Sequence, residues 1–372
     1  MNFLFLASFG EIMAYIGYIL LAILILLIMI TIHELGHYIA GKVFGFGIEE
    51  FAIGFGPKLF SRTQKSGEVF SIRALPIGGF CAFKGEDDES DDPTAFNNKK
   101  WWQRIIVLIS GALMNYLLAI LVIVLMFSVY GQTSLMAYKV EQTTQIESEY
   151  CFQDRDIILS ANGKNVFMVT DLMSAIEGKD KGDLVDFVVR RNGVDTKIQV
   201  ELRTSTHFTN LEDNMTLYKA LGFYFEEQDG AMVNGGLYST SVRFGVFETI
   251  GRSFEYSFVI GGTIFKILGQ LITGALGIGS LGGTVTTIAI TAEAISIGGF
   301  MFFLNMMAFI GVNLAVFNLL PFPALDGSRV VFTLIEGIMK KPVNRKVEGV
   351  IHLVGMILLL GFAVFVDLQR LF

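Results

Sequence analysis

The chain has 372 residues, of which 52% are hydrophobic and 17% are charged, and its formal net charge at pH 7 is -7. This balance is typical of a membrane protein rather than a soluble one, and the acidic charge excludes a broad basic surface for nucleic acid. The two cysteines, Cys81 and Cys151, lie on opposite sides of the membrane in the topology inferred below, which excludes a disulfide framework.

Four uncharged apolar runs are long enough to cross a hydrocarbon core of about 30 Å. They are residues 12–32, 105–128, 294–325 and 349–366. Lipid offers no hydrogen bonds to the backbone, so only helices or a closed barrel can span it, and these runs lack the period-two alternation of barrel strands. We therefore expect a polytopic α-helical membrane protein with four transmembrane helices.

The orientation follows from the basic residues in the short loops, which favour the cytoplasm. They cluster between the first and second runs and between the third and fourth: Lys42, Lys58, Arg62, Lys65, Arg73, Lys84, Lys99, Lys100, Lys340, Lys341, Arg345 and Lys346. Both loops should be cytoplasmic, and the termini and residues 131–293 should lie outside. We expect a multi-pass membrane protein.

The first loop contains two apolar segments, residues 51–60 and 69–83, that favour β-structure and are interrupted by Gly and Pro. They predict a membrane-associated β-hairpin loop that dips toward the bilayer, with an ordinary surface loop as the alternative. The acidic run that follows, residues 85–92, is interpreted as a solvated segment without a function.

Outside the membrane, residues 157–166, 184–190 and 196–202 alternate like strands around an Asn192-Gly193 turn. They predict a small mixed α/β domain. The glycine-rich segment 256–292 is interfacial, re-entrant or spanning. The parity of the basic loops argues against a span there, because one more crossing would place the last basic loop outside.

The main chemical signal is the sequence HELGH at residues 33–37, at the end of the first apolar run. His33 and His37 lie about 40° apart around a helix, so both imidazoles can reach one zinc ion. Glu34 lies beside them, where it can take a proton from the attacking water and pass it to the leaving amine. A histidine pair that merely caps the helix is disfavoured, because ionisable groups at the end of an apolar span are costly unless they are satisfied.

A catalytic zinc ion needs a third protein ligand and an open position for water. The third run ends in the segment Asn318–Gly327, where Pro321 and Pro323 break the helix and deliver Asp326 on the same side as the two histidines. We predict zinc bound by His33, His37 and Asp326, with Glu34 as the catalytic base. His352, in the fourth run, is interpreted as a packing or hydrogen-bonding residue.

Five motifs, which together extend over most of the chain, occur in the same order as in a known family. They are HELGH at 33–37, GFGPKLF at 54–60, PIGGF at 76–80, SGALMN at 110–115 and NLLPFPALDG at 318–327. With this topology, the chain resembles the bacterial site-2 proteases, the RseP-type family of regulated intramembrane proteolysis.

The resemblance implies a multi-pass protein of the bacterial plasma (inner) membrane, with a four-helix core and one extracytoplasmic domain of PDZ type. It implies that Asn115 and Asn318 help to position substrate near the metal, and that a hairpin at Gly78 and Gly79 lies against the unwound substrate. Asn115 alone, inside the second run, is equally compatible with an interhelical hydrogen bond.

These observations divide the chain into a membrane core (1–130), a PDZ-like domain (131–205), a linker with an interfacial or re-entrant helix (206–293) and a second membrane core (294–372). The expected activity is hydrolysis of peptide bonds within transmembrane segments by a zinc metalloendopeptidase, with the active site near the cytoplasmic side. By analogy, the substrates are single-pass proteins such as anti-sigma factors, or remnant signal peptides, first trimmed by a site-1-type protease.

Two other function classes compete with this expectation. An inert membrane scaffold would not need an intact set of zinc ligands. A metal transporter would not need Glu34 between the histidines.

Overall fold

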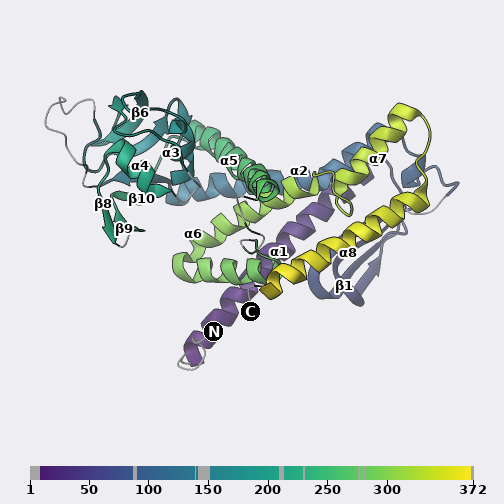
Figure 1. The fold of residues 1–372 in the computed structure, drawn as a ribbon. Coiled ribbons are helices and arrows are strands. Elements are labelled where there is room, and N and C mark those ends of the chain that lie inside the picture. The colour runs from purple at the N-terminus through teal and green to yellow at the C-terminus, as the bar shows by residue number, and fades with distance from the viewer. Residues whose placement is uncertain are drawn as a thin grey trace. The chain divides into compact units, whose positions relative to one another are not determined.

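The computed structural model describes residues 9–86, 90–138, 140, 151–208, 213–228, 231–274, 277, 279 and 281–369. They form two compact units, one made of Met1–Ile123 with Ser257–Phe372 and the other of Val124–Tyr256 (Figure 1). The first unit carries most of the long helices, and the second carries most of the strands.

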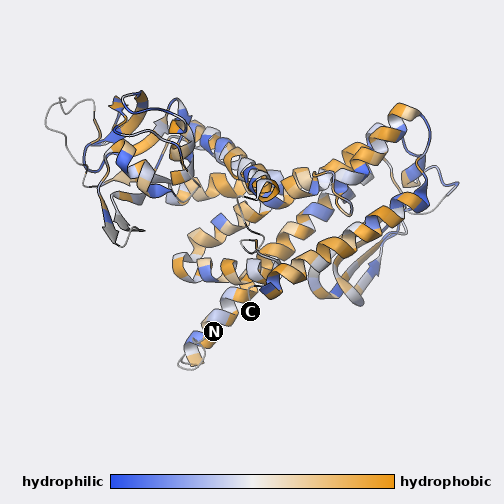
Figure 2. Ribbon diagram, viewed as in Figure 1, coloured by the Kyte–Doolittle hydropathy of each residue, from blue (hydrophilic) through white to orange (hydrophobic). Residues whose placement is uncertain are grey.

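Five helices in the described part of the chain are long and apolar enough to cross a membrane. They are α1 (Phe9–Val43), α2 (Trp101–Tyr130), α5 (Val246–Thr273), α6 (Thr284–Asn318) and α8 (Arg345–Gln369), and they are coloured mainly as hydrophobic in Figure 2. Three of the predicted runs fall in α1, α2 and α8, and the third run, residues 294–325, begins in α6 and continues past the end of that helix at Asn318. Helix α5 covers the first half of the segment 256–292, for which the sequence allowed an interfacial, a re-entrant or a spanning position.

Helix α6 is divided by a break at Gly299, where φ is 60° and ψ is -141°. Only glycine adopts this conformation readily, and the ribbon bends sharply there (Figure 1). The part after the break, residues 300–318, is about 28 Å long at 1.5 Å per residue and can cross the bilayer. The part before it is about 22 Å long, which is too short. The helix ends at Asn318, as the prolines predicted.

Helices α1 and α2 approach each other so closely that their backbones touch. A methyl group added to Gly36 would lie 2.3 Å from the carbonyl oxygen of Ser110. One at Gly111 would lie 2.4 Å from Nε2 of His37. Glycines that allow such contact are common between transmembrane helices, where association depends on close packing.

The predicted hairpin consists of β1 (Ile48–Thr63) and β2 (Val69–Phe83), which pair antiparallel. Both strands bend, so that Phe51 pairs with Phe70 on one side and with Cys81 on the other. The two strands therefore form four short segments, in the order 58–63, 69–73, 48–53 and 79–83. The bends fall at Gly54 and Gly78, both with positive φ.

Glu50 ties these segments together. Its carboxylate accepts hydrogen bonds from Ser71 at 2.5 Å and Arg73 at 2.9 Å, and it forms an ion pair with Lys58 at 3.1 Å. Burial raises the pKa of the Glu50 carboxyl, but these three partners outweigh it and the pKa is lowered. The group therefore stays charged at neutral pH and joins three of the four segments of the bent hairpin.

The second unit is built on a sheet in the order β10-β3-β4-β6-β7, with β5 paired to β4. The strands are β3 (Gln132–Ala137), β4 (Ile157–Ala161), β5 (Lys164–Asn165), β6 (Leu184–Arg191), β7 (Val194–Glu201) and β10 (Leu237–Val242). The Asn192-Gly193 turn joins β6 to β7 with positive φ at both residues, as predicted. The sheet also takes an outer strand, β10, from beyond residue 205.

Smaller elements complete the fold. Helices α3 (Val169–Ile176) and α4 (Asn214–Leu221) supply residues to the core of the second unit, and a short hairpin pairs β8 (Phe225–Gln228) with β9 (Ala231–Gly235). In the first unit, the 3-10 helix η1 (Phe96–Asn98) precedes α2, and α7 (Asp326–Met339) lies between α6 and α8. Cys81 and Cys151 are both free.

The contact at Gly36 makes a testable prediction about stability. Gly36→Ala should destabilise the protein by about 1–3 kcal/mol, because the added methyl group forces the two helix backbones apart. The measurement is the thermal unfolding midpoint in detergent. The control is Gly17→Ala on the same helix, where an added methyl group meets nothing within 4 Å. Equal midpoints for the two variants would show that this contact does not hold the helices together.

Candidate metal centre

Helix α1 places two imidazoles side by side on one face. Nε2 of His33 lies 3.1 Å from Nε2 of His37, and the rings meet edge to face with centroids 4.8 Å apart. Both residues are 8% exposed. Nδ1 of His37 donates to the carbonyl oxygen of Val107 at 2.8 Å, so in the neutral imidazole the proton is on Nδ1 and Nε2 carries none. This is the tautomer that a metal ligand needs.

Asp326 reaches the same point from the first residue of α7. Its Oδ2 lies 3.0 Å from Nε2 of His33 and 3.4 Å from Nε2 of His37. Gly327, the next residue, packs directly against the end of α6, since a methyl group on it would lie 2.4 Å from the carbonyl oxygens of Leu319 and Leu320. The structure thus brings together the three predicted ligands from two parts of the chain.

The geometry of these three atoms fits a zinc ion. Ligand atoms that each lie about 2.05 Å from a tetrahedral ion are roughly 3.3 Å apart, and the observed separations are 3.0, 3.1 and 3.4 Å. Two nitrogens and a carboxylate oxygen are also donors that zinc prefers. Among the described residues, this is the group of three His, Cys, Asp or Glu side chains that can converge on one metal.

Glu34 lies between the metal centre and the hairpin. A methyl group added to Gly79 of β2 would lie 3.3 Å from Cγ of Glu34 and 3.3 Å from Ile30. The backbone of Cys81 is within hydrogen-bonding reach of the Glu34 carboxylate. The hairpin therefore reaches the side of α1 that carries Glu34, and any side chain at residue 79 would intrude on it.

The two predicted asparagines lie on α2 and α6. Nδ2 of Asn318 is 3.5 Å from Nδ1 of His33. Asn115 is completely buried, one turn after Gly111 and on the same face of α2. Neither Nδ2 nor Oδ1 of Asn115 has a hydrogen-bond partner among the described residues. A buried amide without partners costs about 1–3 kcal/mol, so Asn115 is poorly explained as a purely structural residue.

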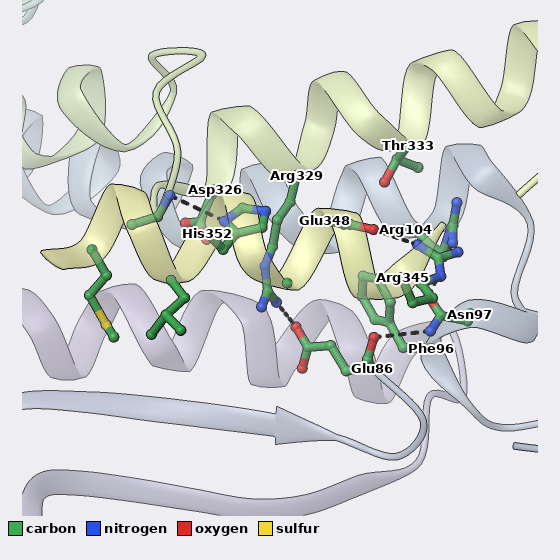
Figure 3. Close-up of a pocket in the computed structure, with 14 residues that line it drawn as sticks. Glu86, Phe96, Asn97, Arg104, Asp326, Arg329, Thr333, Arg345, Glu348 and His352 are labelled. Atoms are coloured by element: carbon green, nitrogen blue, oxygen red, sulfur yellow. Dashed lines mark hydrogen bonds and ion pairs between the residues drawn. The ribbon is translucent and has the colours of Figure 1, made fainter. Parts of the chain in front are cut away.

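A polar cavity of about 440 Å³ opens beside Asp326 (Figure 3). Arg329, one turn after Asp326, forms an ion pair with Glu86, and Arg345 binds Glu348 at 2.8 Å. The residues that line this cavity are Glu86, Phe96, Asn97, Arg104, Ala324, Asp326, Arg329, Thr333, Arg345, Glu348, Gly349, His352, Leu353 and Met356. The carboxylate ligand therefore borders a space that polar groups line.

His352, in the wall of this cavity, is a hydrogen-bonding residue, one of the two roles that the sequence predicted for it. Its Nδ1 accepts the backbone N–H of Ala324 at 3.1 Å, where Ala324 has a φ of 79°. A non-glycine residue in this conformation is strained and persists only where its surroundings hold it. His352 thus helps to hold the turn that delivers Asp326.

Several residues of the site were missed by the sequence analysis. Val107 contributes a carbonyl group, and no side-chain pattern marks that role. Glu86 lies in the acidic run that was assigned no function, yet it pairs with Arg329. Gly36 and Gly111 belong to the motifs HELGH and SGALMN, but their close packing depends on the contact between α1 and α2, which the motifs do not predict.

Comparisons with known proteins agree with this geometry. The family described as Peptidase family M50 matches residues 21–362. A protein of Clostridium perfringens, named as a candidate zinc metalloprotease, is 33% identical over 362 residues, which cover 95% of this chain and 98% of the relative. Similarly named proteins of Brucella suis and Helicobacter pylori are 27% identical over 382 residues and 28% over 359. They cover 98% and 95% of this chain and 97% of each relative.

The family match spans most of the chain and includes all three candidate metal ligands and Glu34. Together with the long apolar helices, it identifies a multi-pass membrane peptidase. The chain belongs to peptidase family M50.

Proposed function

We propose that this protein is an intramembrane zinc protease of the site-2 type, which hydrolyses peptide bonds within transmembrane segments of single-pass membrane proteins. The observation that carries the proposal is the convergence of His33 and His37, within the long apolar helix α1, with Asp326, which follows the end of the long apolar helix α6. A hydrolytic site in such surroundings acts on chains that are themselves in the membrane.

In this mechanism, His33, His37 and Asp326 hold the zinc ion. When bound, zinc polarises the scissile carbonyl and lowers the pKa of water to about 7. The Glu34 carboxylate accepts a proton from the attacking water and passes it to the leaving amine. Val107 holds the proton of His37 on Nδ1, so that Nε2 remains a ligand.

The hairpin supplies a way to hold the substrate. A helix protects its own carbonyls by hydrogen bonding, so the substrate must be unwound before it is cut. Residues 79–83 of β2 pair with residues 48–53 on one side, and no other described strand pairs with their second edge. Addition of an extended substrate to this edge, next to Gly78 and Gly79, would place it beside Glu34.

The buried amide of Asn115 suits a second contact with the substrate. Its N–H group can donate to a substrate carbonyl or to the oxyanion that forms during attack. Asn318, beside His33, can bind the substrate backbone from the opposite helix.

The proposed topology has four spans, α1, α2, the second part of α6, and α8, in a bacterial plasma membrane. The basic loops and the metal centre lie near the cytoplasmic side, and the second unit is an extracytoplasmic PDZ-like domain. Helix α5 then begins on the extracytoplasmic side and does not cross the membrane. Substrates are single-pass proteins such as anti-sigma factors, or remnant signal peptides, and a site-1-type protease trims them first.

The direct test is cleavage of a model single-pass substrate in liposomes, with zinc content measured on the same samples. Glu34→Gln should lower the cleavage rate by about 10²–10⁴-fold because proton transfer is lost, while zinc content is unchanged. His33→Ala should lose both zinc and cleavage. A Glu34→Gln variant that cuts at the wild-type rate would refute the role of Glu34 as the base. A wild type that binds zinc but does not cut would refute the protease and favour a transporter, which does not need this carboxylate.

A second variant separates function from stability at Asn115. Asn115→Leu should leave the unfolding midpoint unchanged or raised, because it replaces an unpaired buried amide by an apolar group of similar size. Cleavage should fall by about 10²-fold if the amide donates to the substrate in the transition state. Zinc content and unfolding midpoint are the controls. A lowered midpoint with normal cleavage would mean that Asn115 is an interhelical packing residue.

A further inference from the structure

A second cavity, of about 430 Å³, lies between α2, α5 and α6 in the first unit. Leu113, Phe258 and Phe265 are prominent in its wall, and they are 50%, 68% and 57% exposed. The wall is almost entirely apolar. Its two hydroxyl groups, of Tyr116 and Ser257, bind each other at 2.8 Å. We refer to this cavity as the apolar groove.

The apolar groove shares two helices with the metal centre. On α2, Ala112 lines the groove and follows Gly111, which packs against His33 and His37. On α6, Leu319 lines the groove and follows Asn318, which lies beside His33. The groove and the metal centre therefore occupy neighbouring faces of the same helix turns.

Asn115 marks the boundary between these faces. By the helical period, it lies about 40° around α2 from Gly111 and about 60° from Ala112 on the other side. Its buried amide is unpaired. Asn115 is not part of the groove wall, and a hydrocarbon chain in the groove would offer its amide nothing. A polypeptide that unwinds from the groove toward the metal centre would pass this amide and bring both carbonyl and N–H groups to it.

Small residues give the groove its depth. Ala112, Gly261, Gly262 and Ala315 form part of its wall. A methyl group on Gly262 would meet nothing within 4 Å, so this residue faces open space. Small residues allow one transmembrane helix to approach another closely, and this is the main source of affinity between helices in lipid.

We propose that the apolar groove is a docking site for the apolar membrane-spanning helix of the substrate, which binds there before the adjacent residues unwind toward the metal. This inference rests on the proposed protease function. The groove selects for a helix with large aliphatic side chains on one face, and Asn115 receives the first backbone groups that become free.

The test fills the groove without disturbing the fold. Gly262→Leu projects a side chain into open space, and leucine also favours the helical conformation more than glycine. The matched control is Gly269→Leu on the same helix, which is outside the groove and where an added methyl group likewise meets nothing within 4 Å. Zinc content and the unfolding midpoint verify that both variants are folded.

Two readouts are measured in liposomes: cleavage kinetics of the single-pass substrate, and its binding to zinc-loaded protein that carries Glu34→Gln. With Gly262→Leu, we expect binding to weaken and KM to rise by about tenfold, as for loss of one anchoring contact, whereas Gly269→Leu should behave as wild type. If the Gly262→Leu protein shows the binding and KM of the wild type, the proposal is wrong. Detection of a bound lipid by native mass spectrometry would then identify the occupant of the groove.

The binding readout distinguishes failure of the docking site from failure of the protease function. If the wild type does not cut the substrate, the protease proposal fails, and weaker binding to the Gly262→Leu protein alone would still support the groove. If the wild type cuts and the two glycine variants bind and cut alike, only the groove is refuted.

Discussion

The contact between the backbones of α1 and α2 is the constraint on which the metal centre depends. With Gly36 against Ser110 and Gly111 against the two imidazoles, no side chain separates the helices at this level. His37 can therefore reach the carbonyl of Val107, which sets its tautomer, and both Nε2 atoms point to one place. In lipid, burial of apolar surface does not drive helices together, so close packing at small residues must do so.

The third ligand depends on a break in the helical backbone, and such a break leaves polar groups that lipid cannot satisfy. Here the protein satisfies them itself. His352 accepts the N–H of Ala324, and the carbonyl of Leu325 accepts from both the backbone and the side chain of Ser328. Further along α7, Arg329 connects the same helix to Glu86 at the end of the hairpin. The ligand and the hairpin are thus parts of one connected structure.

Hydrolysis in an apolar phase requires water and an apolar polypeptide to meet at the same atoms. Two cavities of similar size lie next to the metal centre and differ in their lining. The one beside Asp326 is bordered by charged residues, and the apolar groove between α2, α5 and α6 is bordered almost entirely by apolar residues. The proposed reaction takes its polar and apolar reactants from these two sides, with Glu34 and the hairpin edge at the centre.

The sequence by itself determined four of the five long apolar helices, the hairpin segments, the helix break caused by Pro321 and Pro323, and the identity of the three candidate ligands. These features depend on local pattern: the length of an apolar run, the four-residue spacing of His33 and His37, and prolines that end a helix. Only the tertiary structure decided the break at Gly299, the double pairing of Phe51, the carbonyl of Val107 and the pair between Glu86 and Arg329. The last two join residues 70 and 243 positions apart, and contacts at such separation depend on how helices pack, which no local pattern records.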